Sequence, residues 1–550
     1  MQPIIECVPN FSEGNDLTLI KQITDQIETV EGVRLLNVDP GKATNRTVVT
    51  FVGHPEAVIK AAFLAIQKAG ELIDMSKHKG EHPRMGATDV CPLIPIANIS
   101  MEETAAFAQR LAKKVGEELA IPVYLYEAAQ PNKERNNLSV IRAGEYEGFF
   151  KKIKQPEWKP DFGPAEFDAK RGGTVIGARD FLVAYNINLN TTSTRRANAI
   201  AFDVREAGRN VEENGVKVNK PGTLKSVKAI GWFIEEYGIA QISMNLTNIN
   251  ITPLHIAFDE VCKKAEARGI RVTGSELVGL VPLKSLTAAG KYFLKKQQRS
   301  TGVSEKELIK IAVKSMGLDE LGPFKPEERI IEYLLADKSA SKLVSMQLTA
   351  FADETASESP APGGGSIAAY VGSLGAALAT MVANLSSHKK GWDERWEEFS
   401  NWAEKGEQYK TELLWLVDQD TNAFNQIMMA FGLPKSTDAE KAARTKAIQE
   451  ATKFAIEIPF KVMQSAYGSM EVIKAMAETG NPNSVSDAGV GALCARTSVM
   501  GAFMNVRINA AGYADKEFVA DILRRGREIE NKTIALESEI LNVVNGKIGN

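Results

Sequence analysis

Residues 33–52, VRLLNVDPGKATNRTVVTFV, hold two apolar strand-like runs, Val33–Val38 and Thr47–Val52, with the turn signal Asp39-Pro-Gly between them. A similar run at Ile4–Val8 precedes them, and helical patterns occupy 16–29 and 55–74. Strands that alternate with helices predict a mixed α+β or α/β fold. The beginning of the chain is therefore expected to form a sheet with helices packed on it.

The alternation continues as far as about residue 300. It predicts a strand near 90–96, a helix near 102–119 and a strand at 123–126, followed by a second set of elements. That set comprises strands at 183–189, 225–233, 238–247 and 272–281, with helices near 194–208 and 253–268 and from Leu283. The two sets resemble successive β-α-β-β-α-β sandwiches, and we expect them to form subdomains over 1–180 and 181–328.

The composition changes after a charged connector at 329–343. From 344 to 550 there is no convincing alternating strand, only long patterns with a period of 3.6 residues, which predict an all-α domain. The stretch 367–385 is uncharged and long enough to span a bilayer. It is built mainly from Ala, Gly, Ser and Thr, so it is interpreted as a buried, closely packed helix.

The amino-acid composition argues against several classes of function. The 550 residues carry a formal charge of -3, 25% charged residues and 44% hydrophobic residues, as in an ordinary multidomain globular protein. This balance gives no case for binding nucleic acid or an anionic membrane. Four scattered cysteines match neither a disulfide framework nor a zinc site, and the first residues do not read as a secretory signal. A cytoplasmic protein with reduced thiols is expected.

The segment 78–89, HKGEHPRMGATD, gathers two histidines, an arginine and two carboxylates. His78 and His82 are four residues apart, but Gly80 and Pro83 disfavour the regular helix that a metal pair would need. An imidazole between a carboxylate and a guanidinium suits acid/base chemistry near neutral pH. A polar surface loop is the equally weighted alternative.

Several longer strings carry a family resemblance. They are ECVPNFSEG, VDPGKATNRTVVTFVG, GEHPRMGATDVCPLIPI, DFGPAEF, TVIGARDFLVAYNINL and SELVGLVPL. In this order they resemble the glutamate formimidoyltransferases over nearly all of residues 1–335. The resemblance implies transfer of the formimidoyl group of N-formimidoyl-L-glutamate to N5 of tetrahydrofolate, with His82 as the acid/base residue. It also implies that Arg84, beside His82, is a candidate for substrate binding.

The same resemblance implies further site residues. The folate-binding segment aligns with Gly163, Pro164, Ala165, Glu166, Phe167, Asp168, Ala169, Lys170, Arg171 and Gly172. Further substrate-binding candidates in matching motifs are Asp39, Asn45, Arg46 and Arg205, although Asp39 also fits a turn and Arg205 the solvated face of a predicted helix. A basic tract that would suit a polyglutamyl tail, or form a solvated charge run, comprises Lys151, Lys152, Lys154, Lys159, Lys170 and Arg171.

The helical region holds a second group of candidates. Gly363, Gly364 and Gly365 precede a helix whose first N–H groups favour anions, although a linker followed by close helix packing explains them equally well. Leu413, Val417, Phe424 and Met428 recur at helical spacing, and Asp420 falls on the same stripe while Asp418 does not. A carboxylate there suits proton transfer, or a structural hydrogen-bond network.

The strings APGGGSIAA, VDQDTNAF, LPK and GAFMNVRIN resemble the formimidoyltetrahydrofolate cyclodeaminases. In that reaction N10 attacks the formimidoyl carbon, ammonia leaves, and 5,10-methenyltetrahydrofolate forms; the resemblance implies that Asp420 is catalytic. Asn505 and Asn509 are four residues apart on a predicted helix, where their amides are expected either to hold the pterin or to link helices.

The sequence thus predicts a bifunctional enzyme of histidine degradation that acts on N-formimidoyl-L-glutamate and on tetrahydrofolate, including polyglutamylated forms, as one-carbon acceptor. No metal or nucleotide cofactor is expected. A homo-oligomer, dimer or higher, is expected, because family members place the second site between subunits. The alternatives are a transferase whose helical domain only oligomerises or binds folate, and a non-catalytic folate-binding or scaffolding protein.

Overall fold

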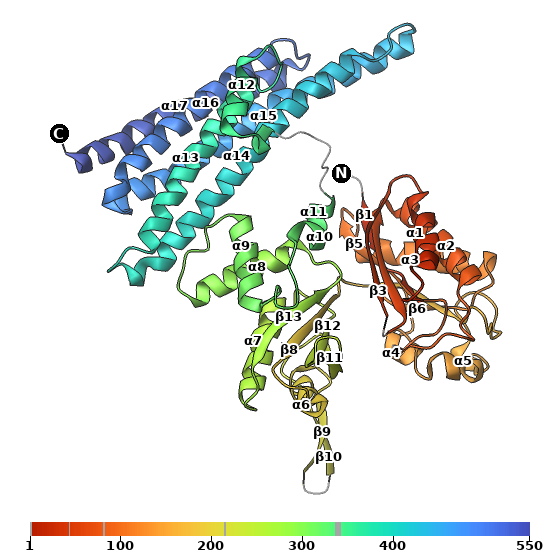
Figure 1. The fold of residues 1–550 in the computed structure, drawn as a ribbon. Helices are drawn as coiled ribbons and strands as arrows, with labels where there is room; N and C mark the ends of the chain where they lie inside the picture. The colour runs from red at the N-terminus through yellow and green to blue at the C-terminus, as the bar shows by residue number, and fades with distance from the viewer. Residues whose placement is uncertain (1–2, 43, 81–82, 214–215, 336–342, 550) are drawn as a thin grey trace. The chain divides into compact units, whose positions relative to one another are not determined.

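The computed structural model describes residues 3–42, 44–80, 83–213, 216–335 and 343–549. Contacts divide the chain into two compact units (Figure 1). The first comprises Met1–Leu286 with Met316–Leu335, and the second comprises Thr287–Ser315 with Ala336–Asn550.

The first unit begins with a β-α-β-β-α-β arrangement. Strands β3, β4, β1 and β5 pair in that order, all antiparallel, and the short β2 lies between β4 and β5. The elements are β1 (Ile4–Cys7), β2 (Asn10–Phe11), α1 (Leu17–Glu28), β3 (Val33–Gly41), β4 (Arg46–Gly53), α2 (Pro55–Leu72) and β5 (Thr88–Ala97). The predicted sandwich is confirmed.

Further elements extend this sheet past β5, where β7 and then β6 add as parallel strands. They are α3 (Met101–Glu118), β6 (Val123–Glu127), α4 (Leu138–Ile141), α5 (Glu145–Lys152), the 3-10 turn η1 (Pro156–Trp158) and β7 (Thr174–Ala178). The parallel pairing requires a crossover, and the chain between β6 and β7 contains α4 and α5. This crossover carries several of the site residues described below.

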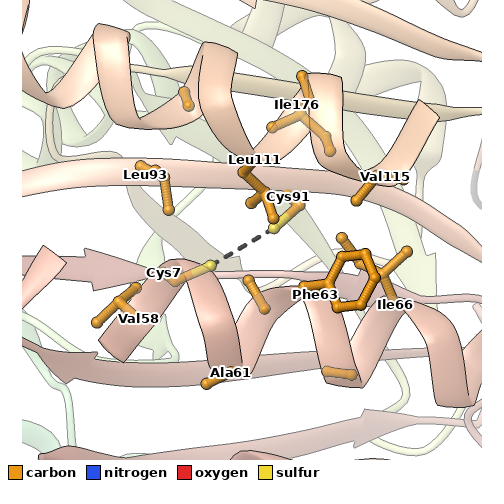
Figure 2. Close-up of a cluster of buried hydrophobic side chains, with 14 of the residues drawn as sticks. Cys7, Val58, Ala61, Phe63, Ile66, Cys91, Leu93, Leu111, Val115 and Ile176 are labelled. Atoms are coloured by element: carbon orange, nitrogen blue, oxygen red, sulfur yellow. Dashed lines mark hydrogen bonds between the residues drawn. The ribbon is translucent and has the colours of Figure 1, made fainter. Parts of the chain in front are cut away.

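Apolar side chains from α2, α3 and the sheet form the core of this region (Figure 2). Cys7 and Cys91 are fully buried within it, and their Sγ atoms lie 3.5 Å apart as free thiols. Burial and the neighbouring thiol raise the pKa of Cys7. The pair is therefore an inert part of the core, because the reactive form of cysteine is the exposed thiolate.

A second sheet repeats the same topology, with β11, β12, β8 and β13 paired antiparallel in that order. Its elements are β8 (Val183–Leu189), α6 (Thr194–Val204), β11 (Val227–Ile234), β12 (Ile239–Leu246), α7 (Leu254–Glu266) and β13 (Val272–Val278). The predicted helix over 194–208 is too long, because it ends at Val204. A hairpin of β9 (Arg209–Glu213) and β10 (Val216–Lys220) follows; β10 is exposed throughout and has no buried face to reveal it in the sequence.

The rest of the described chain is helical. Its elements are α8 (Leu283–Lys296), α9 (Glu305–Met316), α10 (Pro326–Arg329), α11 (Ile331–Leu335), η2 (Leu343–Ser345), α12 (Leu348–Ala356), α13 (Gly364–Ser387), η3 (Asp393–Arg395), α14 (Trp396–Phe431), α15 (Asp438–Thr479), η4 (Pro482–Ser484), α16 (Val485–Ala510) and α17 (Lys516–Ile548). The region from α12 onward confirms the predicted all-α domain.

Helix α13 lies against α14, α15 and α16 at the centre of the second unit. Small residues allow the close approach, since a Cβ at Gly375 would lie 2.8 Å from Gly491 O and one at Gly406 2.3 Å from Thr380 Oγ1. Within the described ranges α13 is the one helix long and apolar enough to cross a membrane, and 61% of its most apolar window is buried. The predicted closely packed helix is confirmed.

The turn between α8 and α9 also packs on the helical unit. Thr301 N donates to Ser400 Oγ at 3.0 Å, and Asn384 Nδ2 donates to Gly302 O at 2.8 Å. Ser300 N donates to Nε2 of His388 at 3.1 Å. This packing places 287–315 in the second unit, although these residues precede the charged connector in the sequence.

Candidate active sites

The first candidate site is the loop 78–89, which leads into β5. Glu81 and His82, the predicted acid/base residue, lie outside the described residues. The segments on either side of them are described. Their contacts explain how the loop is held.

Asn45 ties this loop to two other segments. Its Nδ2 donates to Lys79 O at 2.9 Å, and its Oδ1 accepts from Gly14 N at 3.0 Å. A Cβ at Gly80 would lie 2.3 Å from Thr44 O, so the chain before Glu81 can approach only because it lacks a side chain there. Asn45, a predicted substrate-binding residue, therefore organises the loop through its amide.

Arg84 anchors the other side of the loop and is almost fully buried. Its Nη2 donates to Oε1 of Glu147 at 2.7 Å and its Nη1 to Oε2 at 3.0 Å, and this pairing lowers the pKa of Glu147. Arg84 Nε donates to Nδ1 of His78 at 3.2 Å. The His78 proton must then sit on Nε2, which lies 2.8 Å from the acceptor Asn45 O.

Asp89 organises the end of the loop. It is the extra residue of a β-bulge where β5 meets β2, and its Oδ1 accepts from Met85 N at 3.0 Å. Arg142 Nη2 donates to its Oδ2, and Arg46 Nη1 lies 3.9 Å from the same oxygen. Burial lowers the pKa of Arg46 to about 10, with Asp89 opposing the shift. One buried carboxylate thus positions two guanidinium groups and the loop backbone.

Sequence reasoning missed Arg142. It is the C-cap of the short helix α4 and lies 53 residues from Asp89 in the sequence. No local pattern marks it, because only the crossover between β6 and β7 brings it to the sheet. Arg46, by contrast, lies within the motif VDPGKATNRTVVTFVG, which singles it out as a candidate.

The predicted folate-binding segment 163–172 runs beside the loop. Ala87 N donates to Arg171 O at 2.8 Å, and Gly86 forms a bridge with Gly172. The ring of Phe167 packs against Tyr146, with centroids 5.5 Å apart. The structure therefore brings this segment and the His82 loop together.

Lys170, Arg171 and Lys152 each donate to backbone carbonyls. Lys170 Nζ and Arg171 Nη1 donate to carbonyls at the ends of α2 and α3, at 2.8 and 2.6 Å. Arg171 also pairs with Asp168 at 2.5 Å. Lys152 donates to three carbonyls around the end of α4, and burial lowers its pKa to about 8. These three side chains therefore also stabilise helix ends, whereas Lys151, Lys154 and Lys159 of the predicted basic tract are exposed.

Two other predicted residues lie in secondary structure that differs from the prediction. The turn expected at Asp39-Pro-Gly is instead strand, because β3 continues to Gly41 with Asp39 opposite Val48. Arg205 is not on the helix but is its extended C-cap. Its Nε donates to Gly208 O at 2.9 Å and its guanidinium lies 4.1 Å from the centre of the Phe202 ring, contacts that hold the side chain at the helix end.

The second candidate site forms where α13 begins. Asp420 on α14 accepts at Oδ2 from the buried Ser366 hydroxyl at 2.9 Å. A Cβ at Gly365 would lie 2.1 Å from Asp420 Oδ1, so only glycine leaves room for the carboxylate. The predicted glycines and the predicted carboxylate, 55 positions apart at Gly365 and Asp420, thus meet in one place.

Asp420 serves as the missing cap of α13. The N-cap residue, Gly363, has no side chain that could accept a hydrogen bond from the first turn. The backbone N–H of Ser366, the third residue of the helix, interacts with the Asp420 carboxylate instead. Burial raises the pKa of Asp420, and the two Ser366 groups oppose the shift. The result is a desolvated carboxyl group that is oriented by a helix N-terminus, a setting suited to proton transfer.

Asn505 and Asn509 have different partners. A Cβ at Gly364 would lie 3.5 Å from Asn505 Nδ2, which places this amide beside the site, and the amide also donates to Gly501 O. Asn509 Nδ2 donates to Ala455 O on α15 at 2.7 Å. Of the two predicted alternatives, the interhelical link describes Asn509.

The predicted apolar stripe on α14 is correct only at its start. Leu413 and Val417 are fully buried, but Phe424 is 37% and Met428 55% exposed. The buried face continues instead at intervals of seven residues, through Leu416, Ala423 and Ala430. Steps of four residues drift around a helix with 3.6 residues per turn, whereas steps of seven keep nearly the same face.

Among the described residues, no group of three or more His, Cys, Asp or Glu side chains is arranged to hold a metal ion. A polar loop site on an α/β unit and a desolvated carboxylate in a helical unit together indicate an enzyme with two separate sites. Comparison with known proteins supports this class.

Three family models match the chain. The formiminotransferase domain, N-terminal subdomain, matches residues 4–179; the formiminotransferase domain matches 184–336; and formiminotransferase-cyclodeaminase matches 347–528. A formimidoyltransferase-cyclodeaminase of Gallus gallus is 46% identical over 519 residues, 94% of each chain. The chain belongs to the formimidoyltransferase-cyclodeaminase family, which confirms the resemblance seen in its motifs.

Two shorter relatives match separate parts. A glutamate formimidoyltransferase of Thermoplasma acidophilum is 43% identical over 293 residues, which is 53% of this chain and 92% of the relative. A methenyltetrahydrofolate cyclohydrolase of Methylorubrum extorquens is 38% identical over 198 residues, which is 36% of this chain and 95% of the relative.

Gly365→Ala tests the geometry of the second site. The added methyl group would overlap Asp420 Oδ1, so we expect the carboxylate to separate from Ser366 and the helical unit to lose about 1–3 kcal/mol of stability. Thermal unfolding followed by circular dichroism measures this loss. Gly363→Ala is the matched control, because its new Cβ would meet only Pro360 O at 3.9 Å, an ordinary contact. Equal unfolding midpoints for Gly365→Ala and the wild type would contradict the geometry.

Proposed function

We propose that this chain is an active bifunctional enzyme. It transfers the formimidoyl group from N-formimidoyl-L-glutamate to N5 of tetrahydrofolate and releases glutamate. It then converts 5-formimidoyltetrahydrofolate to 5,10-methenyltetrahydrofolate and ammonia. The observation that carries the proposal is the match over 94% of both chains to a relative named for both activities. We assign the transferase subdomains to 1–180 and 181–328 and the cyclodeaminase domain to 344–550, joined by 329–343.

For the transferase we propose His82 as the proton-transfer residue. The folate amine must lose a proton as it attacks the amidine carbon, and the departing glutamate nitrogen must gain one. One imidazole serves both steps in turn. The contacts of Asn45 and Arg84 hold the described residues on either side of His82.

The ligand-binding residues follow from their positions. We propose that the pterin lies against the segment 163–172, which adjoins the loop, and that Arg46 and Arg84 contribute positive charge for the carboxylates of N-formimidoyl-L-glutamate. Asp39 and Arg205 remain proposed contacts on the strength of their motifs. Tetrahydrofolate is a substrate here, including polyglutamylated forms, and the proposed mechanism requires no metal or nucleotide.

For the cyclodeaminase we propose that Asp420 relays a proton from N10 to the departing nitrogen. Burial raises the pKa of Asp420, which brings the carboxyl group closer to the range in which it can both accept and return a proton. The N-terminus of α13 at Gly363, Gly364 and Gly365, together with the amide of Asn505, lies where the pterin or its substituents would bind. Asn509 serves to join two helices.

The main alternative is a transferase whose helical domain only oligomerises or binds folate, and the third is a non-catalytic folate-binding or scaffolding protein. One experiment separates all three. The pure protein is mixed with N-formimidoyl-L-glutamate and tetrahydrofolate, and glutamate, ammonia and the methenyl chromophore are followed separately. All three products support the proposal, glutamate alone supports the alternative, and no product supports a scaffold. The cellular setting we propose is histidine degradation in the cytoplasm.

His82→Ala should abolish glutamate release while cyclodeamination of supplied 5-formimidoyltetrahydrofolate continues. Loss of a general acid/base group typically costs about 10²- to 10⁴-fold in rate. The second reaction should persist because its carboxyl group lies in a different unit. Glutamate release at a near wild-type rate would remove the role assigned to His82.

Asp420→Asn should give the reverse pattern. It removes the titratable group but keeps size and polarity, so glutamate release should continue, 5-formimidoyltetrahydrofolate should accumulate, and ammonia should fall to the uncatalysed background. Asp418→Asn is the control, since two helical positions turn a side chain by about 200°. Equal losses in both variants would indicate a general structural effect.

The helical unit is also expected to self-associate. Leu374 on α13 and Leu493 on α16 are 43% and 46% exposed and flank the close contact between Gly375 and Gly491. Sedimentation of the full chain at micromolar concentration should show a dimer or higher form, a dimer being the simplest closed form. Leu374→Asp with Leu493→Asp should weaken it, whereas Leu17→Asp, exposed on α1, should not. A monomeric wild type would contradict this.

A further inference from the structure

The hydroxyl group of Ser366 faces two acceptors on α14. Its Oγ lies 2.9 Å from Asp420 Oδ2 and 3.2 Å from the backbone oxygen of Val417. The side chain is fully buried, and a serine hydroxyl has one proton to donate and two lone pairs to accept with. It can therefore donate to only one of these oxygens at a time.

The hydroxyl group of Ser366 differs from other serine hydroxyls of α13 in bonding to another helix. Ser373 and Ser386, further along α13, donate to the carbonyls of Tyr370 and Val382 in their own helix. Ser366, in the first turn, directs its hydroxyl group to α14 instead, although the carbonyl of the N-cap Gly363 lies three residues before it and accepts from Ile367 N.

The two acceptors correspond to the two protonation states of Asp420. When the carboxyl group is ionised, it accepts the Ser366 proton. When the carboxyl group is protonated, its own O–H needs an acceptor, and Ser366 Oγ can accept only if its proton points to Val417 O. Both arrangements give the hydroxyl hydrogen of Ser366 an acceptor, and the second also gives one to the carboxyl hydrogen, which matters because an unpaired buried polar group is costly.

We propose that Ser366 is a positioning residue for the cyclodeaminase reaction, whose hydroxyl rotates between Asp420 Oδ2 and Val417 O as Asp420 loses and gains its proton. The carboxyl group would thereby keep one orientation through both halves of the relay. The proposal rests on the proposed role of Asp420.

The electrostatic environment of Asp420 makes its pKa sensitive to the Ser366 hydroxyl group. Burial and the two Ser366 groups account for the shift in the pKa of Asp420, and no charged side chain in the described part of α13, α15 or α16 contributes to it. Asp418, the neighbouring acid on α14, lies about 200° around the helix. Loss of the hydroxyl group should therefore raise the pKa of Asp420 further.

Ser366→Ala in the full chain tests this through the pH dependence of kcat/KM for supplied 5-formimidoyltetrahydrofolate. The ionised carboxylate loses its donor, so the acidic limb should move to higher pH, with a loss of roughly fivefold at a fixed pH within that limb. Ser366→Cys, a near-isosteric weak donor, should fall between the two. Ser373→Ala is the matched buried control and should keep the wild-type profile.

Two results would overturn the proposal: an acidic limb unchanged in both Ser366 variants, or a loss that is the same at every pH and thus structural. Unfolding midpoints measured in the same buffers identify any variant that fails to fold. If Ser366→Ala fails to fold, the pH profile of Ser366→Cys tests the proposal in its place. Wild-type cyclodeamination by Asp420→Asn would instead refute the proposed role of Asp420, and that outcome is distinguishable from failure at Ser366 alone.

Discussion

The second site depends on a carboxylate of one helix capping the first turn of another. Asp420 can reach the start of α13 only because Gly365 leaves space for it, and because the small residues of α13 let its neighbours pack closely. A helix N-terminus carries partial positive charge, which partly offsets the cost of burying the carboxylate. The composition of α13, rich in Ala, Gly and Ser, is thus explained by the packing that brings a carboxyl group to a helix end.

The two candidate sites are held in place by different kinds of interaction. In the helical unit, the groups that meet at Asp420 come from long helices held by buried side chains. In the α/β unit, the loop around His82 is held by polar contacts to other loops and to the crossover helices, through Asn45, Arg84 and Asp89. Loops that surround a substrate commonly carry function in this way, because their backbone groups are free to bind ligands.

The sequence predicted both repeated sandwiches and the helical domain, because their strands and helices have buried faces that produce a period in the pattern. It did not predict the hairpin of β9 and β10, whose second strand is exposed on both sides. It placed Asp420 on a partly incorrect stripe, since Phe424 and Met428 are exposed, yet it singled out the carboxyl group that meets the start of α13. Arg142 and Ser366 could not be singled out, because their importance arises from partners 53 and 54 residues away.

The turn at Ser300–Gly302 has a consequence for how the two activities are joined. By sequence it lies in the region matched to the formiminotransferase domain, yet its hydrogen bonds go to Ser400, His388 and Asn384 of the helical unit. The covalent junction and the packing boundary therefore do not coincide. A helical fragment cut at the connector would lose α8 and α9, and with them the hydrogen bonds to Ser400, His388 and Asn384.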